Sequence, residues 1–281
     1  DKDALLRSGI MFPKTIRHLK GEDLKDAIPD KLYIPLTDIR MLTKVDLLML
    51  EMLANCNWER PLYLAISVGS VSKLKFDNYF VQEGLAFRFT PFDYKKWGDV
   101  GENRLYAVDV ERLYDNVMNR YKYGGLDTPG LYLDETTLRT CWYHRRLFAQ
   151  LAKELIAQGD NERAKKVLAY AEQVIPGYNV PETHESGSYD IATAYATLGE
   201  KTKAVTLAVH LIAEAEDYIN WAFSLKGNRI EMVRNDCIYK FWQWNQYNEL
   251  LKKIDGEKYK ESNRQFEEKY ALFAPTMSYK N

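Results

Sequence analysis

The sequence predicts a mainly α-helical protein in which a small N-terminal α+β module precedes a series of helical hairpins. Two observations favour this class. Between residues 136 and 176, apolar residues recur three and four positions apart, as on the buried faces of two consecutive helices. Before residue 125, short apolar segments alternate with Gly and Pro, which is typical of strands and loops. We place the α+β module at residues 1–125 and the helical repeats at residues 131–281, with a Gly- and Pro-rich boundary between them.

The segment 136–176 carries the spacing of a tetratricopeptide-like hairpin. Gly159 separates its two helical stretches, because glycine readily adopts the left-handed conformation that closes a helix. The small side chains of Ala152 and Ala164 allow two helices to approach closely, and we expect them to face each other. The places of the tetratricopeptide pattern are taken by Phe148, Leu151, Ala152, Leu155, Ala164, Leu168 and Pro176.

The same signature recurs 40 residues later, as the separation of Leu151 and Ile191 shows (191 − 151 = 40). A plain repeat of this type has about 34 residues, so about six additional residues must be accommodated. They fit into the polar stretch 178–188, before the second hairpin begins. The recurring positions are Ile191, Ala192, Tyr195, Gly199, Ala204 and Ala208.

Further helices are predicted after the second hairpin. Residues 213–225 extend its last helix, residues 229–253 form a long aromatic-rich helix, and residues 257–273 form a final amphipathic helix. This last pair lacks the small residues of the two hairpins. Terminal repeats are often atypical, because one of their faces meets water or another surface.

Two capped helices are predicted in the N-terminal module. Thr43 begins the first, with Asp46 three residues later as in a capping box, and Asp109 begins a second that runs to Tyr121. Each should bury an apolar stripe. The stripes consist of Val45, Leu48, Met49, Met52 and Leu53 on the first helix and of Val110, Leu113, Val117 and Met118 on the second.

The rest of this module is predicted to be irregular or extended. Residues 1–30 contain several Gly and Pro residues and should form no regular element. Residues 31–36 are expected to form an edge strand, because Pro35 cannot donate to a sheet. We expect further strands at residues 61–67 and 85–92 and a short helix at residues 76–82.

Composition and charge restrict the function. The chain has 281 residues and a formal net charge of −1, so no strong field attracts nucleic acid and no such partner is expected. Its 20 Tyr and 6 Trp suit either the core of helical repeats or a sugar-binding surface. No apolar run of about 18 residues is present, and the start at Asp1 without Met indicates a processed or shortened chain. Three isolated cysteines are expected to be unpaired and mostly buried: Cys56, Cys141 and Cys237.

No pattern for catalysis or for a cofactor is found in the sequence. The four histidines have no zinc-binding spacing, and neither a phosphate-binding loop nor a GxSxG turn occurs. His184, Glu185 and Ser186 are the residue types of a catalytic triad, but a triad converges from separate elements, whereas these are neighbours in a predicted loop. We therefore predict no catalytic residue, no cofactor and no metal.

A concave groove is the candidate binding site. Arg146 and Lys153 fall where repeats of this kind face their groove, and Tyr189 and Thr193 occupy the matching side of the second hairpin. Together with Arg139 and Arg145, the first two give this hairpin a basic side that could receive a carboxylate. The alternative is that these residues are solvated and bind nothing.

Four segments resemble one family of membrane proteins. They are LTKVDLLMLEMLANCNWERPLYLAISVG at 42–69, YFVQEGLAFRFTPF at 79–92, VERLYDNVMNRYKYGG at 110–125 and LYLDE at 131–135. The resemblance continues through the helical repeats and so covers most of the chain. The family comprises large multi-spanning proteins of Bacteroidetes-type bacteria, long described as a domain of unknown function and related to protein O-mannosyltransferases. The resemblance implies that this chain is the extracytoplasmic, periplasmic-side part that follows the membrane spans. It also implies that the catalytic acidic residues lie in the membrane part, so none is assigned here.

Three functions remain open from the sequence. The favoured one is a non-catalytic binding or positioning module of a membrane glycosyltransferase-like protein, whose partners are its own membrane spans and a protein, peptide or glycan acceptor. The second is a helical-repeat carbohydrate-binding protein of a glycan-uptake system, which the aromatic content favours. The third is a hydrolase with a site at the junction of the two domains, where ligands often bind.

Overall fold

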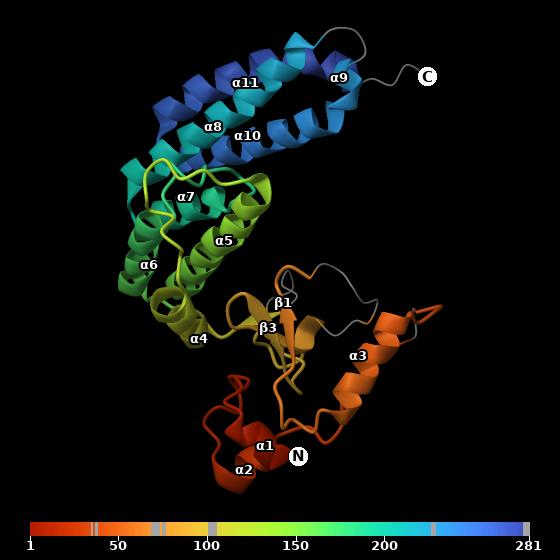
Figure 1. Cartoon of the computed structure of the whole chain (residues 1–281). Coiled ribbons are helices and arrows are strands. Elements are labelled where there is room, and N and C mark those ends of the chain that lie inside the picture. Colours follow the sequence, from red (N-terminus) through yellow and green to blue (C-terminus); the bar gives the residue numbers. More distant parts are fainter. Residues whose placement is uncertain are drawn as a thin grey trace. The chain divides into compact units, whose positions relative to one another are not determined.

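The structure, a computed structural model, describes residues 1–34, 36, 39–68, 74, 77–100, 106–225 and 229–277 (Figure 1). Helices make up 60% of it, and a small mixed sheet lies near the N-terminus, so the predicted class, mainly α with an N-terminal α+β module, is confirmed. The chain divides into two compact units, Asp1–Tyr121 and Lys122–Asn281, which we call unit 1 and unit 2.

Unit 1 contains a four-stranded sheet in the order β1-β3-β2-β4. The β1–β3 and β2–β3 pairs are antiparallel, and β2 and β4 are parallel. The turn between β2 and β3 requires glycine at Gly84, because a Cβ there would lie 2.1 Å from the Tyr121 hydroxyl oxygen. The strands are β1 (Tyr63–Ala65), β2 (Phe80–Gln82), β3 (Ala86–Phe89) and β4 (Ala107–Val108).

The strands predicted at 61–67 and 85–92 are present in shortened form, but other predictions for unit 1 are wrong. Residues 1–30 contain two short helices, α1 (Lys2–Arg7) and α2 (Gly21–Asp26), where an irregular segment was expected. The side chain of Asp1 caps α1, a local signal that outweighs the nearby breakers. Residues 31–34 and 36 form no strand, and Pro35 lies outside the described residues. Of the helix expected at 76–82, residue 76 lies outside the described residues, and the rest is instead a 3₁₀ turn, η1 (Asp77–Tyr79), followed by β2.

Helix α3 (Lys44–Asn55) begins with the predicted capping box but buries a different face. Asp46, Met49, Leu50 and Leu53 turn toward the unit. Asp46 is fully buried, and its carboxylate accepts hydrogen bonds from the backbone N–H and the hydroxyl of Thr43, which offset the cost of burial. The prediction of a buried stripe is therefore wrong for Val45, Leu48 and Met52, which are exposed. An exposed apolar stripe at helical spacing results on α3, consisting of Val45, Leu48 and Met52.

Asp109 caps α4 (Val110–Asp115), which continues into a π-helical turn, η2 (Asn116–Arg120). Val110, Leu113 and Val117 are buried as predicted, whereas Met118, the fourth member of the predicted stripe, is only half-buried. Near this helix, the buried carboxylate of Glu83 accepts hydrogen bonds from Arg112 Nη1 and Tyr63 Oη, both at 3.0 Å.

Arg88 is the second cation at Glu83. It is 3% exposed, and its Nη1 lies 3.6 Å from Glu83 Oε1. Arg88 also donates to the Ser8 carbonyl at 2.8 Å, and Arg112 donates to the Gly9 carbonyl at 2.6 Å. This charged cluster thereby anchors the N-terminal segment to the sheet.

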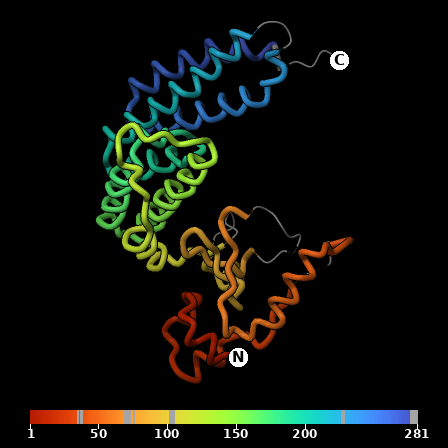
Figure 2. Tube along the Cα trace, viewed as in Figure 1, coloured from red at the N-terminus to blue at the C-terminus, as the bar shows by residue number. Residues whose placement is uncertain are grey.

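The described residues of unit 2 form helices and connecting loops without a strand, and they follow the predicted sequence of hairpins (Figure 2). Gly159 and Gly199 both have a φ of +81° at the turns of the two hairpins. The signature residues Ala152, Ala164, Ala192 and Ala204 are all completely buried, which keeps the hairpins tightly packed. The hairpin helices are α5 (Glu135–Ala157), α6 (Asn161–Val174), α7 (Ser188–Thr197) and α8 (Lys201–Ser224). Their assignment to the tetratricopeptide type stays a prediction.

The C-terminal helices pack through large aromatic side chains. They are α9 (Arg229–Met232), α10 (Arg234–Ile254) and α11 (Gly256–Met277), so the expected single helix at 229–253 is interrupted at Val233. Helix α10 packs against both α8 and α11. Trp244 is fully buried, and its Nε1 donates to Ser262 Oγ at 2.8 Å.

The cysteines are free, as expected; Cys141 and Cys237 are buried, whereas Cys56 is only half-buried. Among the described helices, none combines the length and the apolar character needed to cross a membrane.

Candidate functional site

The connecting segment between the hairpins, residues 175–187, is held in place by Arg145 of α5, which is 3% exposed. Burial lowers the pKa of Arg145 to about 10. Arg145 was expected on the basic, solvent-facing side of the hairpin, and this prediction is wrong. Its guanidinium turns inward and donates to backbone carbonyl groups that would otherwise lack hydrogen-bond partners. It donates four hydrogen bonds of 2.5 to 3.1 Å, to the carbonyl oxygens of Ile175, Val180 and Pro181 and to Ser186 Oγ.

Two of the predicted groove residues, Arg146 and Tyr189, come together at the connecting segment. Arg146 Nε donates to the Glu185 carbonyl at 2.6 Å, and the Tyr189 ring stacks on His184 with centroids 5.8 Å apart. Lys153 and Thr193 are exposed farther along the same two helices. Thr193 Oγ1 donates to the Tyr189 carbonyl at 3.0 Å, while no ion pair involves Lys153 within the described residues.

An exposed aromatic patch adjoins Arg146 and was not predicted as a site. It consists of His184, Tyr189, Tyr239 and Trp242. The rings of Tyr239 and Trp242 are nearly parallel, 12° apart, with centroids separated by 5.6 Å, and the two residues are 45% and 49% exposed. The His184 ring lies edge-on to both. The signal was present in the sequence as two aromatic residues three positions apart on one helix, but their proximity to His184 depends on the path of the connecting segment.

Polar groups fix the connecting segment beneath this patch. Gln243 Nε2 donates to Glu185 Oε1 at 3.0 Å, and Lys240 Nζ lies 3.9 Å from the same oxygen. Burial raises the pKa of the Glu185 carboxyl, but its hydrogen bonds and the charge of Lys240 outweigh this and hold it below the ordinary value. His184 Nδ1 is 2.9 Å from the Tyr247 hydroxyl, and burial lowers the pKa of His184. The imidazole is therefore neutral at pH 7, and the patch carries no charge.

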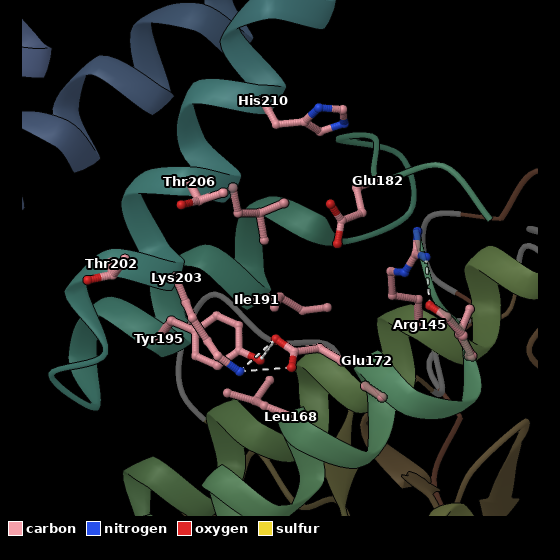
Figure 3. A pocket seen from close by; sticks show the side chains of 13 residues that line it. Arg145, Leu168, Glu172, Glu182, Ile191, Tyr195, Thr202, Lys203, Thr206 and His210 are labelled. Atoms are coloured by element: carbon pink, nitrogen blue, oxygen red, sulfur yellow. Dashed lines mark hydrogen bonds and ion pairs between the residues drawn. The ribbon is translucent and has the colours of Figure 1, made fainter. Parts of the chain in front are cut away.

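A separate pocket of about 360 Å³ lies between α6, α7 and α8 (Figure 3). Its apolar floor comes from all three helices and includes Leu168, Ile191 and Leu207. Glu182 of the connecting segment points into it, and Thr206 and His210 of α8 form another wall.

A hydrogen-bonded network closes one end of this pocket. Glu172 of α6 accepts from Tyr195 Oη at 2.5 Å and from Lys203 Nζ at 2.8 and 2.9 Å. Burial and the neighbouring Glu172 carboxylate raise the pKa of Tyr195, so the phenol stays protonated and donates to Glu172. Lys203 also lies over the Tyr195 ring, 5.0 Å from its centroid.

The residues of His184-Glu185-Ser186 have separate structural partners. His184 contacts Tyr247, Glu185 is held by α10, and Ser186 Oγ accepts from Arg145, so the three do not form a nucleophile, a base and an orienting acid. Across the described ranges, no cluster of three or more His, Cys, Asp or Glu side chains is arranged to hold a metal ion.

Comparison with known proteins gives a match to a family model. No curated protein and no solved structure matches the chain. Residues 11–111, which make up most of unit 1, match the family model described as TMEM260-associated domain 2. This match fits a TMEM260-like family related to protein O-mannosyltransferases. It contains the segments 42–69 and 79–92, whereas the segments 110–125 and 131–135 lie almost entirely outside it.

Proposed function

We propose that this chain is a non-catalytic module of a membrane glycosyltransferase-like protein, and that unit 2 binds the acceptor polypeptide on the periplasmic side of the membrane. The match of residues 11–111 supports the connection to such a membrane protein. The parent's membrane spans would carry the chemistry, and helical hairpins would supply the extended surface that a flexible acceptor needs.

The aromatic patch is the observation that carries the binding role. Large aromatic side chains that are about half exposed and grouped together mark interaction surfaces, because Tyr and Trp supply much contact area at a low entropic cost. The stacked pair Tyr239 and Trp242 meets this description. Arg146, which is bound to the same connecting segment, adds a cation beside it. An extended chain lying along this surface would meet apolar rings first and a charged group next.

The test uses the full-length parent protein and a polypeptide acceptor. We expect Trp242→Ala to raise KM for the acceptor roughly tenfold and to leave kcat unchanged, because a lost binding contact away from the reaction centre weakens ground state and transition state equally. Trp221→Ala is the matched control, since Trp221 on α8 is also 49% exposed and lies against a tyrosine, Tyr218.

Three outcomes contradict this proposal. Equal effects of Trp242→Ala and Trp221→Ala would mean that the patch has no special role. Sugar transfer or glycoside hydrolysis by the isolated chain, lost on a single substitution within it, would show that it is catalytic. Tight binding of free glycans by the isolated chain, with no affinity for polypeptide, would favour a carbohydrate-uptake function instead.

A further inference from the structure

The pocket between α6, α7 and α8 is a second site that the aromatic patch does not use. Its volume of about 360 Å³ lies within the usual range of about 300–1,000 Å³ for pockets that hold small ligands. No residue of α10 lines it, whereas the patch contains Tyr239 and Trp242 of α10. The two sites share the connecting segment, from which Glu182 faces the pocket and His184 faces the patch, and helix α7, which supplies Tyr189 to the patch and Ile191 to the pocket.

The charges around the pocket cancel. Arg145 and Lys203 supply two positive charges, and Glu172 and Glu182 supply two negative ones. Lys203 is bound to Glu172, and Arg145 is bound to backbone carbonyls. A charged ligand would therefore meet a like charge on one wall, whichever sign it had, so the pocket favours a neutral ligand.

Several polar groups of the pocket are available for a ligand. Glu182 and His210 make no hydrogen bond or ion pair with any other residue that the structure describes. The carboxylate accepts hydrogen bonds, the imidazole can donate or accept, and the exposed hydroxyls of Thr202 and Thr206 do both. These groups are complementary to a ligand that carries several hydroxyl groups, because each hydroxyl can both donate and accept a hydrogen bond.

The floor of the pocket is apolar. Leu168, Ile191 and Leu207 present aliphatic surface opposite the polar walls. A pyranose ring has C–H groups on its faces and hydroxyls around its rim, which matches an apolar floor with polar walls. We propose that this pocket binds a neutral sugar ring.

Saturation-transfer NMR on the full chain tests this with three probes that share a gluco-configured pyranose ring: methyl β-glucopyranoside, which is neutral, methyl β-glucuronopyranoside, which is anionic, and methyl β-glucosaminide, which is cationic. We expect the neutral glycoside to bind with a Kd on the order of 1 mM, as is usual for so small a ligand in an open pocket. Both charged probes should bind roughly tenfold more weakly.

Two substitutions locate the binding. Thr206→Phe fills the pocket from an exposed position and should abolish the signal, whereas Thr197→Phe introduces the same ring at an exposed position outside the pocket lining and should preserve it. Glu182→Gln keeps the shape and should weaken binding roughly tenfold, because a hydrogen bond to a charged acceptor is lost. The thermal midpoint of each variant, measured alongside, shows whether it is folded.

The outcomes decide the proposal. No signal from the neutral glycoside overturns it, as does a signal that folded Thr206→Phe protein retains. A preference for the anionic or the cationic probe overturns the argument from charge balance. Because Trp242 is not part of this pocket, Trp242→Ala should leave the signal unchanged, and the result is therefore independent of the acceptor-binding proposal.

Discussion

Each unit contains an arginine that is 3% exposed and holds a neighbouring chain segment by its backbone carbonyls, but only one of the two has a carboxylate partner. In unit 1, Arg88 lies beside the buried Glu83 and donates to the Ser8 carbonyl. In unit 2, Arg145 donates to carbonyls and to Ser186 Oγ, with no ion pair within 4.0 Å among the described residues.

The difference separates two ways of keeping a guanidinium inside a protein. Arg112, which is half-buried and also pairs with Glu83, shows the first way. Burial alone would lower the pKa of Arg112, but the charge of Glu83 outweighs this effect and the pKa is raised. At Arg145 burial prevails, and the pKa falls to about 10. Unit 1 therefore depends on compensated charge, whereas unit 2 depends on the geometry of a planar fork that meets several carbonyls at once.

Glu83→Gln should have the largest effect, because it leaves buried Arg88 and half-buried Arg112 without their counter-charge. Breaking a buried pair on one side typically costs about 3–5 kcal/mol. Denaturant unfolding followed by circular dichroism should show an early transition of unit 1, with unit 2 unchanged. Glu59→Gln is the exposed control. A loss no larger than that of the control would mean that charge compensation is unimportant here.

Arg145→Met should have the second largest effect. The methionine fills the space without a charge to bury, but it leaves the carbonyls of the connecting segment without donors, at about 2–3 kcal/mol in all. Hydrogen exchange should accelerate between residues 175 and 187. Arg145→Lys should not restore protection, because one ammonium cannot reproduce the fork. Full restoration by lysine would show that the charge matters and the geometry does not. Arg139→Met serves as the exposed control.

The smallest effect on stability is expected from Glu214→Gln, a change on α8. Burial raises the pKa of the Glu214 carboxyl, with Glu185 and Glu182 adding to the shift and His210 and Lys240 opposing it. A raised pKa means that the ionised form weakens the fold. The stability that the protonated form contributes is present below the ordinary pKa of 4.5 and is lost as pH rises through the raised value.

Glu214→Gln should therefore stabilise the chain at pH 7 by less than about 1 kcal/mol and give no benefit at pH 4. Thermal midpoints at the two pH values check this. Glu216→Gln is the matched comparison, because Glu216 lies 3.3 Å from Lys269 Nζ and loses that ion pair on substitution. Stabilisation by both variants alike would point to general charge reduction and not to burial of an unpaired carboxylate.

Much of the fold could be predicted from sequence because its signals are local. The hairpins follow from helical spacing and from Gly159 and Gly199, and Thr43 and Asp109 begin their helices as expected. The buried face of α3 could not be predicted, because its apolar residues surround most of the helix and the choice of face depends on packing within unit 1.

The site was less accessible to sequence reasoning. Arg146 and Tyr189 do meet at one segment, but the inward turn of Arg145 depends on carbonyls 30 to 36 residues away. The aromatic patch combines His184 with Tyr239 and Trp242, both of which lie more than 50 positions after His184 in the chain. No local sequence pattern predicts a contact between residues so far apart in the chain.

Arg145 and Arg146 hold the connecting segment from two sides of one helix, and this restricts how related sequences can vary. Consecutive positions on an α-helix differ by about 100° in direction, so a one-residue insertion or deletion in α5 before Arg145 would turn both guanidinium groups away from their acceptors. Gly187 is restricted as well: its φ is +85°, and a Cβ there would lie 2.9 Å from Arg146 Cγ. Relatives that keep the long connection should therefore keep the Arg-Arg pair and the glycine 41 positions after the second arginine (187 − 146 = 41), while Pro181, which meets Arg145 only through its backbone carbonyl, is less restricted.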